Sequence, residues 1–138
     1  MAEEQKGRVT GIGGVFFLAN DDNKALAKWY EDVLGIPMQE WGGGILEWRE
    51  DTAEDGGSTV WHVGAQDSDW FAPSKARFMI NYRVDDMDAL LAKFKNLNVE
   101  VLQGPEYHEN GVFTWIVDPE GNKVELWQPM LWDDKNKR

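Results

Sequence analysis

The chain repeats one plan of secondary structure, and this repeat constrains its fold more than any other feature. In the first half, an apolar segment at 15–19 precedes polar residues and then apolar residues at three- and four-residue spacing, ending at Gly35. This pattern predicts a strand and an amphipathic helix. In the second half, alternating apolar residues at 78–84 precede two candidate N-cap residues, Asp85 and Asp86, and a helical stripe from Leu90 to Leu97.

Three short extended segments follow each predicted helix, separated by turns rich in glycine and proline. They span 38–41, 45–49 and 58–63 in the first half, and 99–103, 112–117 and 123–128 in the second. The sequence therefore predicts an α+β fold of two βαβββ modules, at 8–66 and 76–129, with a linker at 67–75 and a polar tail at 130–138. Since neither module can bury its sheet face alone, we expect the two to pair.

Composition narrows the class of protein. The 138 residues suit one compact domain, and the absence of cysteine excludes disulfides and thiolate nucleophiles. Fourteen basic against 25 acidic residues give a net charge of -11, and no basic patch offsets it, so we expect no binding to nucleic acid. No apolar run approaches the roughly 20 residues that span a bilayer, and no apolar signal segment opens the chain. We therefore expect no membrane partner and a cytoplasmic location.

Three motifs carry a family resemblance. They are FFLANDDNKALAKWYEDVLGI, YRVDDMDALLAKF and VDPEGNKVELWQP, in this order along the chain. With them, residues 10–129 resemble the vicinal oxygen chelate superfamily, which includes glyoxalases, extradiol dioxygenases, fosfomycin-resistance enzymes and bleomycin-resistance proteins. The resemblance implies that the two modules form a cup-shaped mixed sheet around a pocket, which usually holds a divalent metal. It also implies a homodimer.

The resemblance further assigns the four metal-ligand positions to Gly14, Trp61, Met79 and Glu125. Glycine has no side chain, the tryptophan N–H cannot ligate, and a thioether is a poor partner for a hard cation. Only Glu125 keeps a suitable donor. We therefore expect no metal cofactor.

Strand alternation through these positions predicts which side chains line the pocket. Trp115 is added from an intervening strand whose facing the sequence does not fix. The predicted ligand pocket comprises Phe16, Trp61, Met79, Asn81, Trp115, Glu125 and Trp127. Of the two histidines, we expect His62 to face the helix as a packing residue and His108 to lie in an exposed loop.

Three functions remain open from the sequence. The first, which we favour, is binding of a small cationic or aromatic ligand in an aromatic pocket, with Glu125 as hydrogen-bond acceptor or counter-charge; Trp61 and Met79 could instead only fill the vacant metal site. The second is a glyoxalase- or dioxygenase-type enzyme, a lyase or oxidoreductase, with Glu125 as catalytic acid or base or in an atypical metal site. The third is a protein-interaction module using Trp70 and Trp132, which could equally cover a dimer interface.

Overall fold

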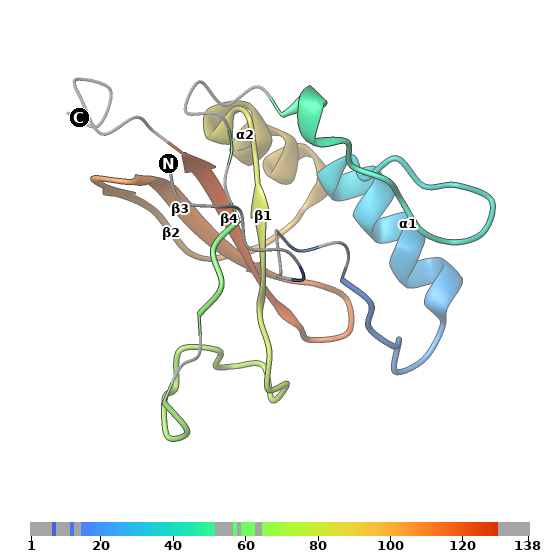
Figure 1. Ribbon diagram of the computed structural model, residues 1–138, viewed down its shortest axis with the longest axis horizontal. Helices are drawn as coiled ribbons and strands as arrows, with labels where there is room; N and C mark the ends of the chain where they lie inside the picture. Colours follow the sequence, from blue (N-terminus) through green and yellow to red (C-terminus); the bar gives the residue numbers. More distant parts are fainter. Residues whose placement is uncertain are drawn as a thin grey trace.

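A computed structural model describes Gly7, Ile12, 15–51, Gly57, 59–62 and 65–129 of the chain (Figure 1). Within these residues it contains two α-helices, one short 3-10 helix and four strands. The helices are α1 (Asn23–Leu34), η1 (Trp48–Glu50) and α2 (Met87–Leu97). The strands are β1 (Ile80–Arg83), β2 (Val101–His108), β3 (Gly111–Val117) and β4 (Lys123–Pro129).

The strands form one mixed sheet in the order β1-β4-β3-β2. The first strand runs parallel to β4, while β4 and β3, and β3 and β2, are antiparallel. This is the βαβββ order predicted for the second half of the chain, and the α+β class is confirmed. The strand predicted at 99–103 extends further, to His108, with register shifts against β3 on either side of Gln103.

Both α-helices begin and end at residues that the sequence favours for these roles. Asp22 accepts hydrogen bonds from the backbone N–H groups of Lys24 and Ala25, and Asp86 accepts one from Ala89. Each caps a first turn whose N–H groups have no helical partner. Gly35 ends α1 in the left-handed conformation, as predicted.

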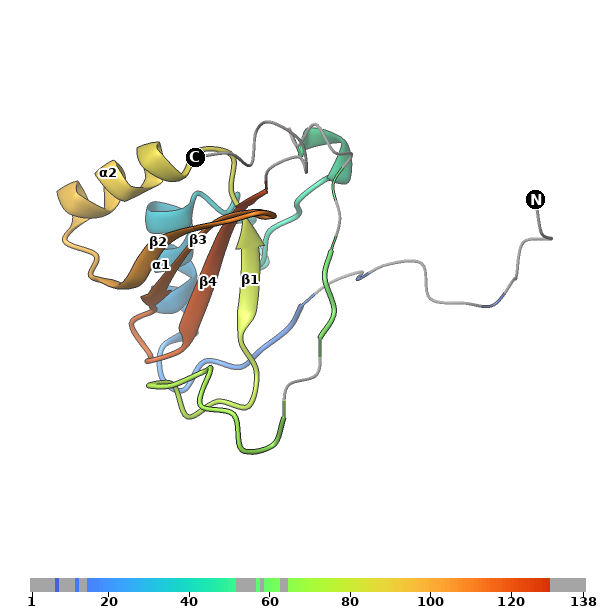
Figure 2. The same ribbon diagram turned by 90° about the vertical axis from the view of Figure 1, so that its left-hand side faces the viewer.

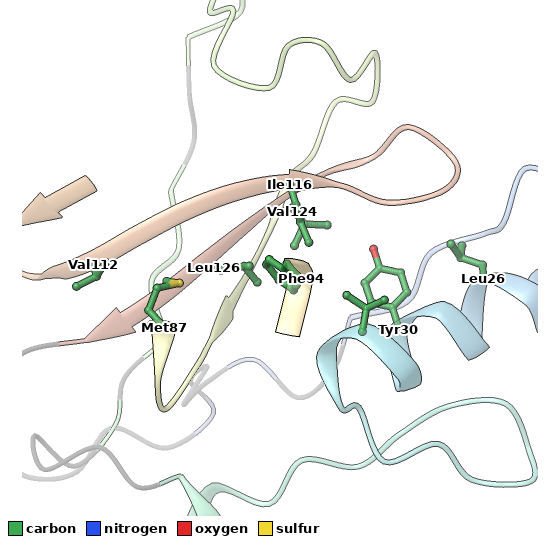
Figure 3. Packing of buried hydrophobic residues seen from close by; sticks show 9 residues of the cluster. Leu26, Tyr30, Met87, Phe94, Val112, Ile116, Val124 and Leu126 are labelled. Atoms are coloured by element: carbon green, nitrogen blue, oxygen red, sulfur yellow. The ribbon is translucent and has the colours of Figure 1, made fainter. Parts of the chain in front are cut away.

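The hydrophobic core lies between the sheet and the two helices, which cover the same face (Figures 1 and 2). Alternation along the strands sends every second apolar side chain to this face. Figure 3 shows how these side chains meet. The buried cluster comprises Leu26, Tyr30 and Val33 of α1, Met87 and Phe94 of α2, and Val112, Ile116, Val124 and Leu126 of the sheet. The opposite sheet face is thereby left for a site.

The turn between β3 and β4 joins the two halves of the chain. Asp118, 3% exposed, accepts a hydrogen bond of 2.8 Å from the Tyr30 hydroxyl of α1. The Glu120 carboxylate accepts hydrogen bonds from the backbone N–H groups of Asn20 at 2.6 Å and Asp21 at 3.0 Å, just before α1. The turn therefore holds the first helix by both of its acidic residues.

The strands predicted for the first module differ from the structure. Within 15–51 and 59–62, Met38 and Gly44 form one isolated bridge, and residues 48–50 form η1 where a strand was predicted. Alternation of side chains does not by itself supply backbone partners, and a short strand without a neighbour is not stable. The prediction of strands at 15–19, 38–41 and 45–49 is therefore wrong, and so is the described part, 59–62, of the strand predicted at 58–63. Ser58, Val63 and the tail at 130–138 lie outside the described residues.

Candidate functional site

Glu125 lies at the centre of the sheet face opposite the helices. The register of β1 and β4 pairs Asn81 with Glu125, and the register of β3 and β4 pairs Trp115 with Glu125. Residues that pair in register point to the same face of a sheet and contact one another. We call this the cup face, and the pairing fixes the orientation of Trp115, which the sequence left open.

The Glu125 carboxylate is buried, with 7% of the residue exposed. Asn81 Nδ2 donates to Oε1 at 2.7 Å, and Trp115 Nε1 donates to Oε2 at 2.8 Å. Both donors are neutral, and among the described residues no ion pair involves Glu125. Since each carboxylate oxygen has two acceptor sites, each can accept one further hydrogen bond.

Three aromatic rings form a row beside this carboxylate. The Phe113 ring lies nearly parallel to Trp115, with centroids 6.1 Å apart and planes at 16°, and to Trp127, at 6.0 Å and 10°. Trp127 Nε1 donates to the backbone carbonyl of Asn110 at 2.9 Å, which holds that ring in place. Both tryptophans are buried, at 6% and 8% exposed, and Phe113 is half-buried, so Phe113 and Asn81 offer the accessible part of the row.

Two cations flank the aromatic row. The Arg83 guanidinium lies 5.2 Å from the Trp127 ring centroid, and its Nε forms an ion pair with Asp51 at 2.7 Å. The Lys123 ammonium lies 5.9 Å from the Trp115 ring centroid and donates to the backbone carbonyl of Trp70 at 2.7 Å. These positions are typical of cation–π contacts.

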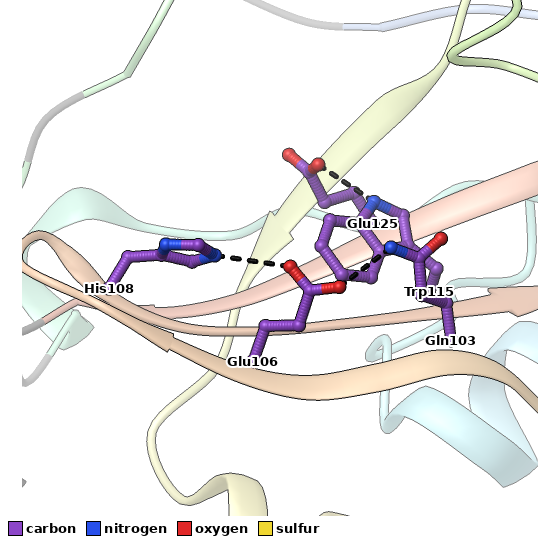
Figure 4. A network of polar contacts seen from close by, with 5 residues as sticks. All are labelled: Gln103, Glu106, His108, Trp115 and Glu125. Atoms are coloured by element: carbon purple, nitrogen blue, oxygen red, sulfur yellow. Dashed lines mark hydrogen bonds and ion pairs between the residues drawn. The ribbon is translucent and has the colours of Figure 1, made fainter.

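A polar chain on β2 borders the row. Gln103 Nε2 donates to Glu106 Oε2 at 2.7 Å, and His108 Nε2 lies 3.1 Å from Glu106 Oε1 (Figure 4). The hydrogen bond from Gln103, and then that from His108, holds the pKa of the Glu106 carboxyl below its usual value. The His108 ring meets the Phe113 ring edge-on at 5.7 Å. The prediction of a loop at His108 is wrong, because the strand continues past Pro105 and carries the imidazole to the row.

A family model described as a glyoxalase-like domain matches residues 15–127. The chain belongs to the glyoxalase-like domain family. The match spans the cup face and α1, and it confirms the predicted membership of the vicinal oxygen chelate superfamily. No curated protein matches the chain. In the described part of this glyoxalase-like chain, neither α-helix is long and apolar enough to cross a membrane.

Solved structures share the fold at low sequence identity. The antibiotic binding protein TnmS3 from Streptomyces sp. CB03234 is 20% identical, with a TM-score of 0.53 over 88% of this chain and 100% of that chain. The virulence protein STM3117 from Salmonella typhimurium is 14% identical, with a TM-score of 0.51 over 79% and 89%. A lactoylglutathione lyase from Agrobacterium tumefaciens is 21% identical, with a TM-score of 0.47 over 82% and 90%. At these identities, the likeness to TnmS3 and STM3117 establishes the fold alone.

The residues at the family's metal positions do not fit a divalent cation. Of the four, Gly14 lies outside the described residues, Trp61 has no atom that can coordinate a metal, and Met79 offers only a thioether. Both Glu125 oxygens face N–H donors, and the Lys123 ammonium lies against the neighbouring ring, where a metal would meet positive charge. Within the described part of the chain, no three His, Asp or Glu side chains lie together as a metal site requires.

The structure brings four of the predicted pocket residues together: Asn81, Trp115, Glu125 and Trp127. Met79 is half-buried and precedes Asn81 by two positions, on the same side by alternation. Phe16 and Trp61 are 94% and 77% exposed and make no hydrogen bond or ring contact with this group among the described residues. The sequence did not identify Phe113 as part of the site, although its spacing of two from Trp115 would have indicated it.

Two further features of the described residues are His62 and a surface hollow. His62 is exposed and its ring meets Trp70 edge-on at 5.8 Å, so the prediction that it packs toward the helix is wrong; segment 59–62 forms no strand that would orient it. A hollow of about 350 Å³ lies on the helix side, between α1 and the end of α2, and includes Trp29, Asp32 and Glu100. It contains none of the cup-face residues.

Proposed function

We propose that this glyoxalase-like protein binds a small planar aromatic ligand that carries a positive charge or an N–H donor, on the cup face and without the family metal. The observation that carries the proposal is the buried Glu125 carboxylate, which has two neutral partners and no counter-ion among the described residues. A buried charge is unfavourable unless it is paired. A cationic ligand would supply the missing partner.

The aromatic row supports the planar part of the ligand. Parallel rings of Phe113, Trp115 and Trp127 present the flat apolar surface that aromatic ligands favour. Since Arg83 and Lys123 already lie over the two tryptophan rings, we assign recognition of the ligand's charge to Glu125 rather than to a tryptophan face. The ligand would approach through Phe113 and Asn81, the less buried members of the group. TnmS3, an antibiotic binding protein, shows that this fold accommodates ligand binding.

Isothermal titration with a matched pair of probes tests the proposal. The probes are 2-(aminomethyl)naphthalene, a cation at neutral pH, and 2-naphthalenemethanol, its neutral counterpart. We expect the amine to bind more tightly, and Glu125→Gln to weaken the amine about 10- to 100-fold, because a hydrogen bond to a charged group contributes about 1.5–3 kcal/mol. The neutral probe should bind both proteins equally.

Glu100→Gln is the matched control, because Glu100 is exposed and lies outside the cup face. It should leave both affinities unchanged. The proposal is refuted if neither probe binds, or if Glu125→Gln binds the amine as tightly as the unsubstituted protein does. Metal analysis of the purified protein addresses the metal-free part: a stoichiometric divalent ion would contradict it.

A second candidate is an enzyme in which Glu125 accepts a proton from the ligand. The unused acceptor sites of its buried oxygens favour this reading. Conversion of a bound ligand, lost in Glu125→Gln with binding retained, would establish it.

We also propose a homodimer formed through the first module. Six large apolar residues there are more than two-thirds exposed: Phe16, Leu18, Trp41, Trp48, Val60 and Trp61. Their summed exposed surface is on the order of the roughly 800 Å² that one partner buries in a standard interface. Light scattering should give a mass near twice the 15.8 kDa of the chain. A monomer at micromolar concentration would contradict the proposal.

A further inference from the structure

Lys123 is a second buried charge on the cup face. The residue is 6% exposed, and one of the three N–H groups of its ammonium donates to the backbone carbonyl of Trp70 at 2.7 Å. No carboxylate of the described residues forms an ion pair with it. A carbonyl needs only a neutral donor, so this contact alone does not account for a charged side chain at a buried position.

Lys123 and Glu125 lie two residues apart on β4 and therefore on the same face. Both contact Trp115: the ammonium lies 5.9 Å from the ring centroid, and the carboxylate accepts the ring N–H at 2.8 Å. No ion pair joins the two, because each is held by its own neutral partner. The cup face thus presents two opposite buried charges at one tryptophan, the ammonium over its ring and the carboxylate at its N–H, and neither has a counter-ion among the described residues.

We infer that Lys123 binds an anionic group of the ligand, so that the ligand is a zwitterionic planar aromatic compound with a carboxylate for Lys123 and an ammonium group for Glu125. This inference rests on the proposed function and specifies its ligand class. The aromatic body lies on the row that includes Trp115, and the two ends of the ligand supply the counter-charges that the described residues lack. The attraction between Lys123 and the carboxylate of the ligand outweighs the repulsion from the acidic surface of the chain. Salt screens the field of distant surface charges beyond about 10 Å.

Three naphthalene probes of one size test the inference by isothermal titration. They are 2-(aminomethyl)naphthalene, 2-naphthoic acid and 6-(aminomethyl)-2-naphthoic acid, which carry the cation, the anion and both. We expect the zwitterion to bind about tenfold more tightly than the amine, because its carboxylate adds one charge-assisted hydrogen bond with Lys123. Lys123→Met, which keeps the apolar stem, should abolish this advantage, so that the zwitterion binds the variant no more tightly than the amine does. Lys95→Met, on the exposed side of α2, is the matched control and should change nothing.

The urea midpoint of unliganded Lys123→Met gives a second test. A lysine that serves the ligand and a lysine that serves only the structure predict opposite changes in this midpoint. If Lys123 serves the ligand, Lys123→Met replaces an unpaired buried ammonium by an apolar chain, and the urea midpoint should stay equal or rise. If Lys123 serves only to hold Trp70, the midpoint should fall while the zwitterion keeps its advantage over the amine in Lys123→Met, and the inference is overturned.

The binding outcomes separate this inference from the proposed function. A zwitterion that binds no more tightly than the amine overturns the inference and leaves the proposed function standing. Failure of all three probes refutes the proposed function and, with it, the inference.

Discussion

Removal of the Tyr30 hydroxyl tests how the first helix is held to the sheet. Tyr30 is 5% exposed on α1, and its hydroxyl donates to Asp118 Oδ2 at 2.8 Å across 88 residues of sequence. Burial, followed by the charges of Tyr82 and Asp118, raises the Tyr30 pKa, so the hydroxyl stays protonated as a donor. Tyr30→Phe deletes one oxygen and keeps the ring in its contacts with Phe17 and Trp29.

The magnitude follows from what remains at Asp118. A hydrogen bond to a charged group contributes about 1.5–3 kcal/mol. Asp118 keeps three other donors, the backbone N–H groups of Glu120 and Asn122 and the Asn122 side-chain amide, so its carboxylate is not left unsatisfied. We therefore expect Tyr30→Phe to lower the free energy of unfolding by about 1.5–2 kcal/mol, near the lower end of this range.

Urea unfolding of a double-mutant cycle measures the contact itself. The cycle comprises Tyr30→Phe, Asp118→Asn and the double variant, since residues in contact show non-additive effects. We expect a coupling free energy of about 1–2 kcal/mol. A loss of unfolding free energy below about 0.5 kcal/mol in Tyr30→Phe would refute the reasoning, because a loss this small is typical of a substitution away from any specific contact. Additive effects in the cycle would refute it as well.

Three further predictions concern local features. Asp22→Ala should lower the unfolding free energy by about 1 kcal/mol in urea, because two N–H groups of α1 lose their cap. Gly111→Ala should destabilise by more than about 2 kcal/mol and shift the tryptophan emission, since at φ 140° its Cβ would lie 2.3 Å from the Gln128 carbonyl oxygen and 2.7 Å from Trp127 Nε1. Burial raises the pKa of Tyr82 to about 12. Because the unfolded side chain ionises near pH 10, the contribution of Tyr82 to stability is intact below that pH and falls as pH rises toward 12, by about 1.4 kcal/mol at pH 11. Tyr82→Phe should flatten this loss, and equal slopes for both proteins would contradict it.

The second module could be predicted from the sequence because its signals are local and agree with one another. Alternation around Tyr82, the cap at Asp86 and the helical spacing that includes Phe94 each indicate the element that the structure contains. Glu125 and Trp127 were placed on the cup face by the same alternation, and the register of β4 with its neighbours confirms their orientation.

The remaining differences arise where structure depends on distant partners. The first-module segment with Phe16 has a strand-like pattern, but a local pattern does not specify a partner strand, and residues 15–19 form no strand. The facing of Trp115 depends on the register of β3 against β4, which no local pattern gives. At His108, the glycine–proline pair at 104–105 indicates a turn, whereas the strand continues through it with a shift of register.

The turn that holds α1 by Asp118 and Glu120 also determines when the first half of the chain can fold. Its contacts with Asn20, Asp21 and Tyr30 join residues 100, 99 and 88 positions apart. During synthesis the chain emerges from its N-terminal end, so α1 waits for most of the protein before its partners leave the ribosome. Until then the residues of the sheet that cover its apolar side have not been synthesised. The contacts by which the turn joins the two halves of the chain therefore form late in synthesis.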